Sequence, residues 1–251
     1  MRLPLVCLAL LASLPLAADE SIALTVRGKT QVLARLDRGP GVQNVTVLFL
    51  PGDGGWRGAA IPMAATMASW GYQTYGFDTK KYLEMFSQSG LKLSRIQMAQ
   101  DLRALIGELP GGASGPVVIV GWSQGAAMAV AAVSGYPAHA RIKGIITLGL
   151  PESAVLGWDW RATLAIIARR EPNQPTFAVK PLLPSVTPVP LWMIHGARDE
   201  YTSPEVERAL FQSASEPKRY AEVPDADHRF GGHEAELHRS LKAGLAWIAP
   251  N

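Results

Sequence analysis

The feature that most constrains the fold is a short junction, Gly-Trp-Ser-Gln-Gly, from Gly121 to Gly125. It separates an apolar, β-branched run at residues 117–120 from an alanine-rich run at residues 126–133. The first run has the length of a buried strand, and the second predicts a helix that is apolar on every side. Glycines at such a junction allow a tight turn, so a purely structural role is one interpretation.

The same junction matches the G-x-S-x-G pattern of a nucleophile elbow through Gly121, Ser123 and Gly125. In that motif a strained turn between a strand and a helix exposes the serine hydroxyl above the edge of a sheet. The strand and helix expected on either side supply the context that the motif requires. We therefore predict that Ser123 is a catalytic nucleophile.

The rest of the chain alternates between strand-like and helix-like segments. Strands are expected at residues 22–26, 31–36, 45–50, 72–77, 142–150, 189–195 and 219–223, and helices at residues 59–70, 94–109, 204–213 and 234–248. This alternation predicts an α/β fold with a mainly parallel sheet and helices on both faces. Functional residues should then gather at the carboxyl ends of the strands.

One connection is too long for a simple turn. Residues 151–188 contain Trp158, Trp160 and five prolines from Pro172 to Pro188. An inserted lid and a plain surface excursion both account for such a length. The sequence has no internal repeat or linker that would mark a second domain, so residues 19–251 are expected to form one domain with a lid-like insertion at about 151–188.

The N-terminus has the pattern of a secretory signal. Arg2 precedes fourteen uncharged residues, and Ala17-Ala18 are followed by two acidic residues. The apolar run is shorter than the roughly 20 residues that span a bilayer, which favours a signal peptide at residues 1–18 over an uncleaved anchor. The only cysteine, Cys7, lies inside this run. The mature protein is expected in the periplasm or outside the cell, without a disulfide.

The charge of the chain argues against a nucleic-acid partner. The net charge is +3, and removal of residues 1–18 lowers it to +2 because only Arg2 is lost. No block of five or more basic residues is present. Such a weak positive charge is compatible with peripheral contact with an anionic membrane surface. The histidines lack the spacing of metal ligands, and the glycines match no nucleotide-binding motif. We therefore expect neither a metal nor a cofactor.

A serine nucleophile needs a base within hydrogen-bond reach. His228 follows the last expected strand, where its side chain can reach over the carboxyl edge of the sheet, and it is the favoured base. His233, expected in the first turn of the closing helix, is the alternative. His139, His195 and His238 are expected to be structural or surface residues.

The base in turn needs an acid, which in this chain order should lie between the serine and the histidine. Asp199 stands four residues after the strand that ends at His195 and is the favoured acid. A surface ion pair with Arg198 is the alternative for Asp199. Other carboxylates are less favoured as the triad acid: Glu200, Asp225 and Asp227.

An oxyanion hole needs N–H donors at fixed positions. The backbone of Gln124, directly after the nucleophile, should supply one, and the loop Pro-Gly-Asp-Gly-Gly-Trp-Arg-Gly at residues 51–58 should supply another through Gly54 or Gly55. Asp53 complicates this site, because a carboxylate beside an oxyanion repels it unless the side chain turns away. We expect Asp53 to shape the loop.

With these residues in view, the triad order, the elbow and the strand pattern resemble the α/β-hydrolase fold. Three stretches resemble, more narrowly, the bacterial virulence protein family VirJ, also found as a domain of AcvB: L-P-G-D-G-G-W-R at residues 50–57, G-F-D at residues 76–78 with Tyr82 following, and G-W-S-Q-G-A. The resemblance implies a periplasmic protein that hydrolyses the aminoacyl ester of aminoacylated phosphatidylglycerol, with a link to type IV secretion. The second half, in H-G-A-R-D-E-Y-T-S-P and A-D-H-R-F, looks more like acyl esterases and dienelactone hydrolases.

The expected function is therefore a secreted serine hydrolase that cleaves a small-molecule or lipid ester through an acyl-enzyme. If the substrate is an aminoacyl ester, its ammonium group should lie near a carboxylate, and Asp53 and Asp78 are the candidates, with Trp56 of the same loop as a further substrate contact. A generic carboxylesterase or dienelactone-hydrolase-like enzyme is one alternative. A non-catalytic, secretion-associated binding protein on the hydrolase scaffold is the other.

Overall fold

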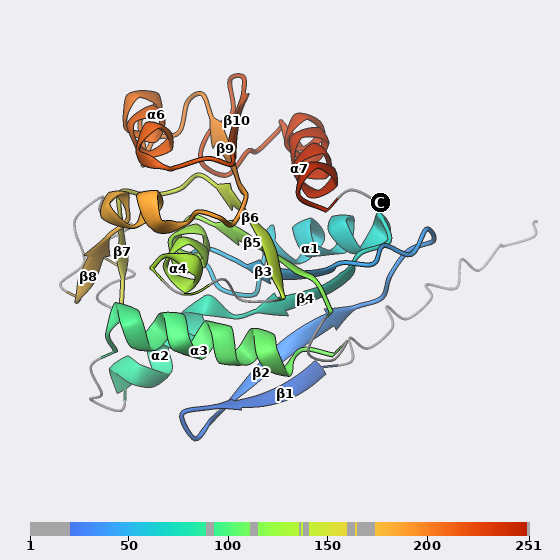
Figure 1. Cartoon of the computed structure of the whole chain (residues 1–251), viewed down its shortest axis with the longest axis vertical. Coiled ribbons are helices and arrows are strands. Elements are labelled where there is room, and N and C mark those ends of the chain that lie inside the picture. The colour runs from blue at the N-terminus through green and yellow to red at the C-terminus, as the bar shows by residue number, and fades with distance from the viewer. Residues whose placement is uncertain are drawn as a thin grey trace, which may run out of the picture.

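The computed structural model of the chain describes residues 21–88, 93–110, 115–135, 137, 141–159, 164 and 174–249. Its central feature is an eight-stranded sheet with the strand order β1-β2-β4-β3-β5-β6-β9-β10 (Figure 1). The strands of this sheet are β1 (Ser21–Val26), β2 (Lys29–Leu36), β3 (Thr46–Leu50), β4 (Gln73–Phe77), β5 (Val117–Trp122), β6 (Ile142–Leu148), β9 (Leu191–Gly196) and β10 (Lys218–Val223). The predicted signal peptide, with Cys7, and His139 lie outside the described residues.

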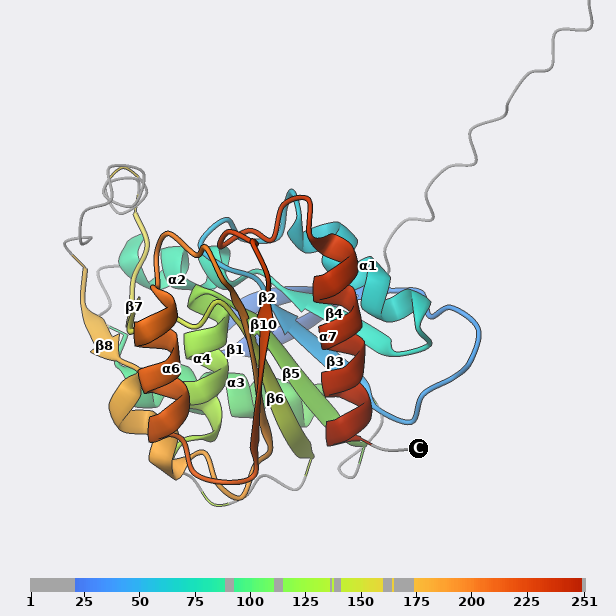
Figure 2. The same ribbon diagram turned by 90° about the horizontal axis from the view of Figure 1, so that it is seen from above.

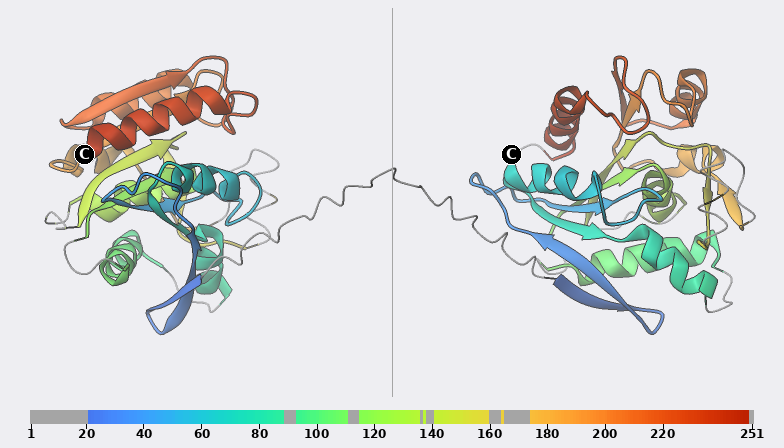
Figure 3. Two further views of the ribbon diagram at one scale, coloured as in Figure 1. Left: turned by 90° about the vertical axis from the view of Figure 1, so that its right-hand side faces the viewer. Right: turned by 180° about the vertical axis from the view of Figure 1, so that it is seen from behind.

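The sheet is parallel except at one edge. The strands β1 and β2 form an antiparallel hairpin, and β2 pairs antiparallel with β4. All other neighbours in the sheet are parallel. Figure 3 shows the β1–β2 hairpin at one edge and β10 at the opposite edge. The strands β5 and β9 are buried along their whole length, as expected of parallel strands covered on both faces. This arrangement confirms the prediction of an α/β fold with a mainly parallel sheet.

Helices cover both faces of the sheet (Figure 2). One face is covered by α1 (Ala60–Ser69) and α7 (Glu234–Ile248), and the other by α2 (Thr79–Gln88), α3 (Arg95–Glu108), α4 (Gln124–Val133) and α6 (Pro204–Ser213). Each face has its own apolar core. The helix α4 is buried at every position, which explains its alanine-rich sequence, because only small side chains allow a helix to pack closely on all sides.

The register of the parallel strands brings their carboxyl ends to one edge. Leu50 pairs with Gly121, and Gly121 pairs with Thr147. Leu148 in turn pairs with Ile194. The loops that follow β3, β5, β6 and β9 therefore leave the sheet at nearly the same level, and the functional residues predicted on these loops share one edge.

The long connection at residues 151–188 is partly described. It contains β7 (Ser153–Val155) paired antiparallel with β8 (Thr176–Ala178), and the 3₁₀ helix η1 (Lys180–Ser185). The Gln124 side chain links this segment to α4 through two hydrogen bonds. Its Nε2 atom donates to the Val155 carbonyl at 2.9 Å, and its Oε1 atom accepts the Val155 N–H at 3.0 Å. Trp158 is buried, whereas Trp160 lies outside the described residues. Whether this segment is a lid or a plain surface excursion stays open, as the sequence left it.

Candidate active site

Ser123 occupies a strained turn between β5 and α4. Its backbone has φ 52° and ψ −117°, a left-handed conformation that costs energy for a residue with a side chain. Its N–H donates to the Leu148 carbonyl at 2.8 Å. The side chain is half-buried and faces a pocket. This is the backbone geometry of a nucleophile elbow.

The two glycines of the junction are required by close backbone approach. A Cβ atom on Gly121 would lie 2.6 Å from the Ala126 Cα atom, and one on Gly125 would lie 2.6 Å from the Pro51 carbonyl oxygen. Real Cβ atoms do not approach so closely. The elbow therefore depends on both glycines, and Gly125 also sets how near the residue 51–58 loop lies to α4.

His228 and Asp199 are joined by a hydrogen bond. The His228 Nδ1 atom lies 2.6 Å from the Asp199 Oδ2 atom. The other carboxylate oxygen of Asp199 accepts the N–H groups of Tyr201 and Thr202 at 2.8 and 3.0 Å. With Nδ1 as donor, His228 keeps its Nε2 atom free to act on Ser123. The Trp122 indole donates to the His228 carbonyl at 3.2 Å and so holds the histidine loop against the strand that carries Ser123.

Asp199 is held in its charged form. Burial of the carboxyl group opposes ionisation, but the hydrogen bond and the charge of His228, with the N–H groups of Thr202 and Tyr201, outweigh that cost and lower the pKa of Asp199 below its ordinary value. A buried carboxylate in this position fixes the tautomer of the imidazole and stabilises an imidazolium.

The alternative residues for the triad lie elsewhere or have other partners. His233 is the residue before α7 and does not line the pocket. Glu200 accepts the backbone N–H of His228 at 3.1 Å. Asp225 pairs with Arg198, and Asp227 accepts backbone N–H groups within its own loop.

Gly149, which was not predicted from the sequence as a site residue, lies against the His228–Asp199 pair. Its φ is 54°, and a Cβ atom there would lie 3.0 Å from the His228 Nδ1 atom and 3.2 Å from the Asp199 Oδ2 atom. A side chain at the end of β6 would therefore collide with the His–Asp pair. The sequence placed Gly149 inside the strand expected at residues 142–150, whereas β6 ends at Leu148.

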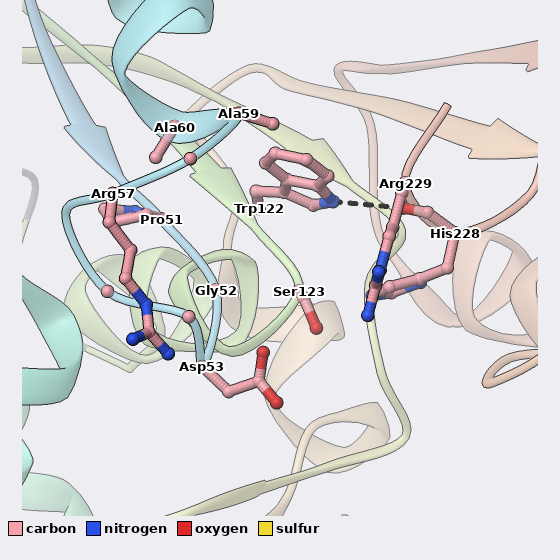
Figure 4. Close-up of a pocket in the computed structure, with 13 residues that line it drawn as sticks. Pro51, Gly52, Asp53, Arg57, Ala59, Ala60, Trp122, Ser123, His228 and Arg229 are labelled. Atoms are coloured by element: carbon pink, nitrogen blue, oxygen red, sulfur yellow. Dashed lines mark hydrogen bonds between the residues drawn. The ribbon is translucent and has the colours of Figure 1, made fainter. Parts of the chain in front are cut away.

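Ser123 and His228 line one cavity of about 290 Å³. Figure 4 shows the Ser123 hydroxyl between the residue 51–58 loop on one side and His228 on the other. Within the described part of the chain, the Ser123 hydroxyl has no hydrogen bond to His228. Such bonds commonly tighten only when substrate is bound. The same ranges contain no group of three or more side chains that could hold a metal ion.

The loop after β3 approaches the serine through Gly52. A Cβ atom on Gly52 would lie 3.2 Å from the Ser123 Cβ atom. The Thr79 hydroxyl, at the start of α2, lies 2.8 and 3.1 Å from the carbonyl oxygens of Pro51 and Gly52. Because a trans peptide points its N–H away from its carbonyl, these contacts direct the N–H groups of Gly52 and Asp53 away from Thr79.

The two glycines predicted for the oxyanion hole have different surroundings in the structure. The N–H of Gly55 donates to the Gly52 carbonyl at 3.0 Å, so it is already used within the loop. Gly54 lines the pocket but is exposed. Gln124, in contrast, is the first residue of α4, and its N–H has no acceptor within the helix.

Of the three predicted substrate contacts, only Asp53 lines the pocket. The prediction for Trp56 needs correction, because its ring packs on Phe49 at 6.4 Å between centroids and fills the space above Gly76. The prediction for Asp78 also needs correction. Its carboxylate accepts the N–H of Lys81 at 3.0 Å, at the start of α2.

A buried group of titratable side chains lies near Asp199. His195, at the end of β9, is fully buried, and its Nδ1 atom is 3.9 Å from the Asp199 Oδ2 atom. Burial lowers the pKa of His195 despite the nearby Asp199. Glu207 of α6 is also fully buried, and burial together with the charge of Asp199 raises its pKa well above the ordinary range. Burial thus favours the neutral form of both groups beside Asp199.

Comparison with known proteins supports the fold. An esterase domain from Rhodothermus marinus matches with a TM-score of 0.64 and 16% identity, covering 91% of this chain and 98% of the other. A dienelactone hydrolase from Anabaena variabilis has a TM-score of 0.63 and 18% identity, covering 92% and 97%. XC6422 from Xanthomonas campestris, an α/β serine hydrolase without a lid, has a TM-score of 0.62 and 19% identity, covering 94% and 99%.

Comparison of the sequence with family models gives a match, whereas comparison with individual curated proteins gives none. No curated protein sequence matches the chain. The family model of the bacterial virulence protein (VirJ) matches residues 44–168. That segment contains Asp53 and Ser123 and ends before Asp199 and His228. The chain therefore has the α/β-hydrolase fold and, over residues 44–168, it is similar to the VirJ family.

Proposed function

We propose that this chain is a serine hydrolase that cleaves a carboxylic ester. The observation that carries the proposal is the pocket in which Ser123, on its strained turn, faces His228, whose Nδ1 atom is bonded to the charged Asp199 at 2.6 Å. A serine hydroxyl becomes a useful nucleophile when such a histidine takes its proton. The esterases and hydrolases of similar fold support the same reaction class.

In this mechanism the Ser123 Oγ atom attacks the ester carbonyl carbon while its proton passes to the His228 Nε2 atom. The N–H of Gln124, with that of Gly52 or Asp53, stabilises the oxyanion. The bond to the alcohol oxygen then breaks, and the alcohol leaves with the proton from His228. Water, deprotonated by the same histidine, hydrolyses the acyl-enzyme, releasing the acid and restoring Ser123.

For the substrate, we propose an aminoacyl ester, with aminoacylated phosphatidylglycerol as the leading candidate. The support is the similarity to VirJ in residues 44–168 and the position of Asp53, whose carboxylate lies beside the Ser123 hydroxyl in the pocket (Figure 4). Asp53 has no ion-pair partner among the described residues, so it is available to a substrate ammonium group. An exposed contact of this kind contributes about 1 kcal/mol.

The experiment compares an aminoacyl ester with its N-acetyl derivative, which has the same ester bond without the positive charge. We expect the charged ester to be cleaved about fivefold faster in kcat/KM, and Asp53→Asn to remove most of the difference. Lys81→Gln, which changes one charge outside the pocket, is the control. Equal rates on both esters would favour the generic carboxylesterase or dienelactone-hydrolase-like alternative. Absence of turnover on every ester, by folded protein, would favour a binding protein.

We further propose that the domain acts in the periplasm or outside the cell, after removal of residues 1–18. The support is the sequence pattern of the N-terminus. Within the described residues, no helix combines the length and apolar character needed to cross a bilayer. N-terminal sequencing of the exported protein should begin at Asp19. A protein that retains Arg2 and stays with the membrane fraction would indicate an anchor instead.

A further inference from the structure

A buried histidine next to the acid of the triad has no role in the reaction proposed above. His195 lies near the carboxyl end of β9, and its side chain points to the face of the sheet that α6 covers, like that of Met193 two residues earlier. It is fully buried, and neither ring nitrogen has a hydrogen-bond partner within the described part of the chain. A buried polar group without a partner costs stability. An imidazole at this position therefore calls for an explanation that packing does not supply.

His195 faces the same carboxylate oxygen as the proposed base. The Asp199 Oδ2 atom lies 2.6 Å from the His228 Nδ1 atom and 3.9 Å from the His195 Nδ1 atom. The other oxygen, Oδ1, already accepts two backbone N–H groups, those of Tyr201 and Thr202. A carboxylate oxygen can accept two hydrogen bonds, so Oδ2 has room for one more donor. The contact of 3.9 Å is longer than a hydrogen bond, and a shift of about 1 Å would make it one.

The surroundings of His195 favour one form of its ring. Burial lowers the pKa of His195, although the charge of Asp199 opposes this shift, so the neutral form is favoured. A neutral imidazole carries a hydrogen on only one of its two nitrogens. Because the Asp199 Oδ2 atom is an acceptor, the tautomer with the hydrogen on Nδ1 points its N–H dipole at the carboxylate.

The other ionisable groups near His195 come from α6 and β10. Glu222, its register partner on β10, is bound to Arg208 of α6 at 3.1 Å, and the two have opposite effects on the pKa of His195. Among the charged neighbours, Asp199 has the largest effect. Burial raises the pKa of two further groups on these elements, Glu207 and Tyr220. The main electrostatic partner of His195 is therefore the acid of the proposed triad.

We propose that His195 is a positioning residue for the triad, whose Nδ1–H acts as a second donor to the Asp199 Oδ2 atom and shares the carboxylate charge with His228. This inference rests on the proposed hydrolase function and extends it to a residue that touches neither the substrate nor Ser123. Two donors on one oxygen draw on the same negative charge, so the second weakens the first bond. His228 then holds the proton from Ser123 less tightly and passes it more readily to the leaving alcohol.

The first test observes the two histidines by NMR and does not depend on catalysis. In isotope-labelled natural protein, the ring nitrogen signals of His195 should be those of a neutral imidazole with its hydrogen on Nδ1. The His228 Nδ1–H proton, in its short bond to Asp199, should give a signal far downfield. His195→Phe should move this signal further downfield, because Asp199 loses its second donor. A hydrogen on the Nε2 atom of His195, or a His228 signal that does not move, overturns the proposal.

The control and the companion variants separate this role from packing. Thr147→Val is the matched control, because Thr147 pairs with Met193 on the neighbouring strand, is fully buried, and has a hydroxyl without a partner among the described residues. It should leave the His228 signal in place. His195→Asn keeps an N–H donor near the position of Nδ1, whereas His195→Gln places one near Nε2. If His195→Phe does not fold, these two variants decide: only His195→Asn should retain the natural signal.

The second test measures kcat/KM on a chromogenic ester as a function of pH. The acid limb of this profile reports the protonation of the base in the free enzyme. His195→Phe should move the limb to higher pH by about 0.5–1 unit, which lowers kcat/KM about threefold to tenfold on the limb and changes the plateau little. His195→Asn should restore the limb. A purely structural role would lower the plateau or the stability and leave the limb unmoved.

The outcomes distinguish this proposal from the proposed function. Turnover by the natural protein, with the same acid limb in His195→Phe, overturns the role of His195 and leaves the esterase proposal intact. Absence of turnover on every ester by the folded natural protein overturns the esterase proposal. In that case the His228 proton signal decides whether His195 acts on Asp199: a shift in His195→Phe supports the contact, and an unchanged signal overturns it. The groups facing His228 other than His195 stay the same in all of these variants: Asp199, Glu200, Tyr201, Asp53, Arg57 and Arg229.

Discussion

At the scale of single residues, the proposed chemistry depends on a histidine that one hydrogen bond orients. His228 is bonded to Asp199 at 2.6 Å, and its ring also packs on Tyr201 at 4.9 Å between centroids. These two contacts orient the ring, and the Trp122 bond to the His228 carbonyl holds the backbone that carries it. The imidazole therefore needs little reorganisation when a substrate arrives, which is what makes a general base effective.

The first prediction separates the two candidate histidines. His228→Ala should reduce ester turnover by about 10⁴-fold or more, because the members of a triad act as a unit. His233→Ala should cost far less, since His233 does not line the pocket. Steady-state rates on a chromogenic ester measure both, with thermal unfolding to show that each variant is folded. The reverse ranking would move the base to His233.

The second prediction concerns Glu207. Burial and the charge of Asp199 raise its pKa well above the ordinary 4.5, so the folded protein keeps the proton that the unfolded chain releases as pH rises. This group therefore destabilises the fold increasingly above pH 4.5 until its folded-state pKa is reached, by up to about 1.4 kcal/mol per pH unit.

The neutral isostere Glu207→Gln removes this titration. Its stability relative to the natural protein should be nearly constant at pH 4 or below and should improve as the pH rises above 4.5, as measured by urea unfolding. Glu152→Gln, at an exposed glutamate, is the control and should show no such trend. A stability difference for Glu207→Gln that does not change with pH would contradict the buried, protonated state.

At the scale of elements, the site depends on how closely two elements approach at Gly125. The start of α4 packs directly on the end of β3, where the Leu50 and Pro51 carbonyls leave no room for a Cβ atom. This contact positions the residue 51–58 loop over the N-terminus of α4, where the proposed oxyanion donors meet.

The third prediction follows from that contact. Gly125→Ala should destabilise the protein by about 3 kcal/mol or prevent folding, because backbone on both sides resists displacement. Gly107→Ala, at an exposed position in α3 with open space around it, should instead stabilise by about 0.5–1 kcal/mol through helix propensity. Urea unfolding measures both changes. Equal effects of the two substitutions would show that the elbow has room for a side chain.

The sequence predicts elements well where one physical signal dominates. The apolar runs predicted β3, β5 and β9, and the Ser94 capping box is present at the start of α3. The helix α2 was missed, although Tyr82, Leu83 and Phe86 are buried on one side of it. Two lysines and its short length hid this pattern, and only packing against the core reveals it.

The sequence predicts less about which loop residues face the site. Chain order and strand ends were enough to place Ser123, Asp199 and His228 at one edge of the sheet. The direction of a side chain within a glycine-rich loop depends on backbone turns that the sequence does not specify. Trp56 and Asp53 stand three residues apart, yet one packs on the core and the other faces the pocket.

At the scale of the whole molecule, the fold brings four distant segments to one edge. The residue 51–58 loop follows β3, Ser123 follows β5, Asp199 follows β9 and His228 follows β10, with the sheet holding their positions. The similarity to VirJ covers the first two segments, while the acid and base lie beyond it. The central claim is therefore that these segments form one working catalytic unit.

The most direct measurement of that claim is covalent labelling with a fluorophosphonate probe, read by intact mass and peptide mapping. The account predicts one adduct per chain, located on Ser123, absent in Ser123→Ala and formed far more slowly in His228→Ala. A folded protein that forms no adduct, or that is labelled on another residue regardless of the Ser123→Ala change, would contradict the account.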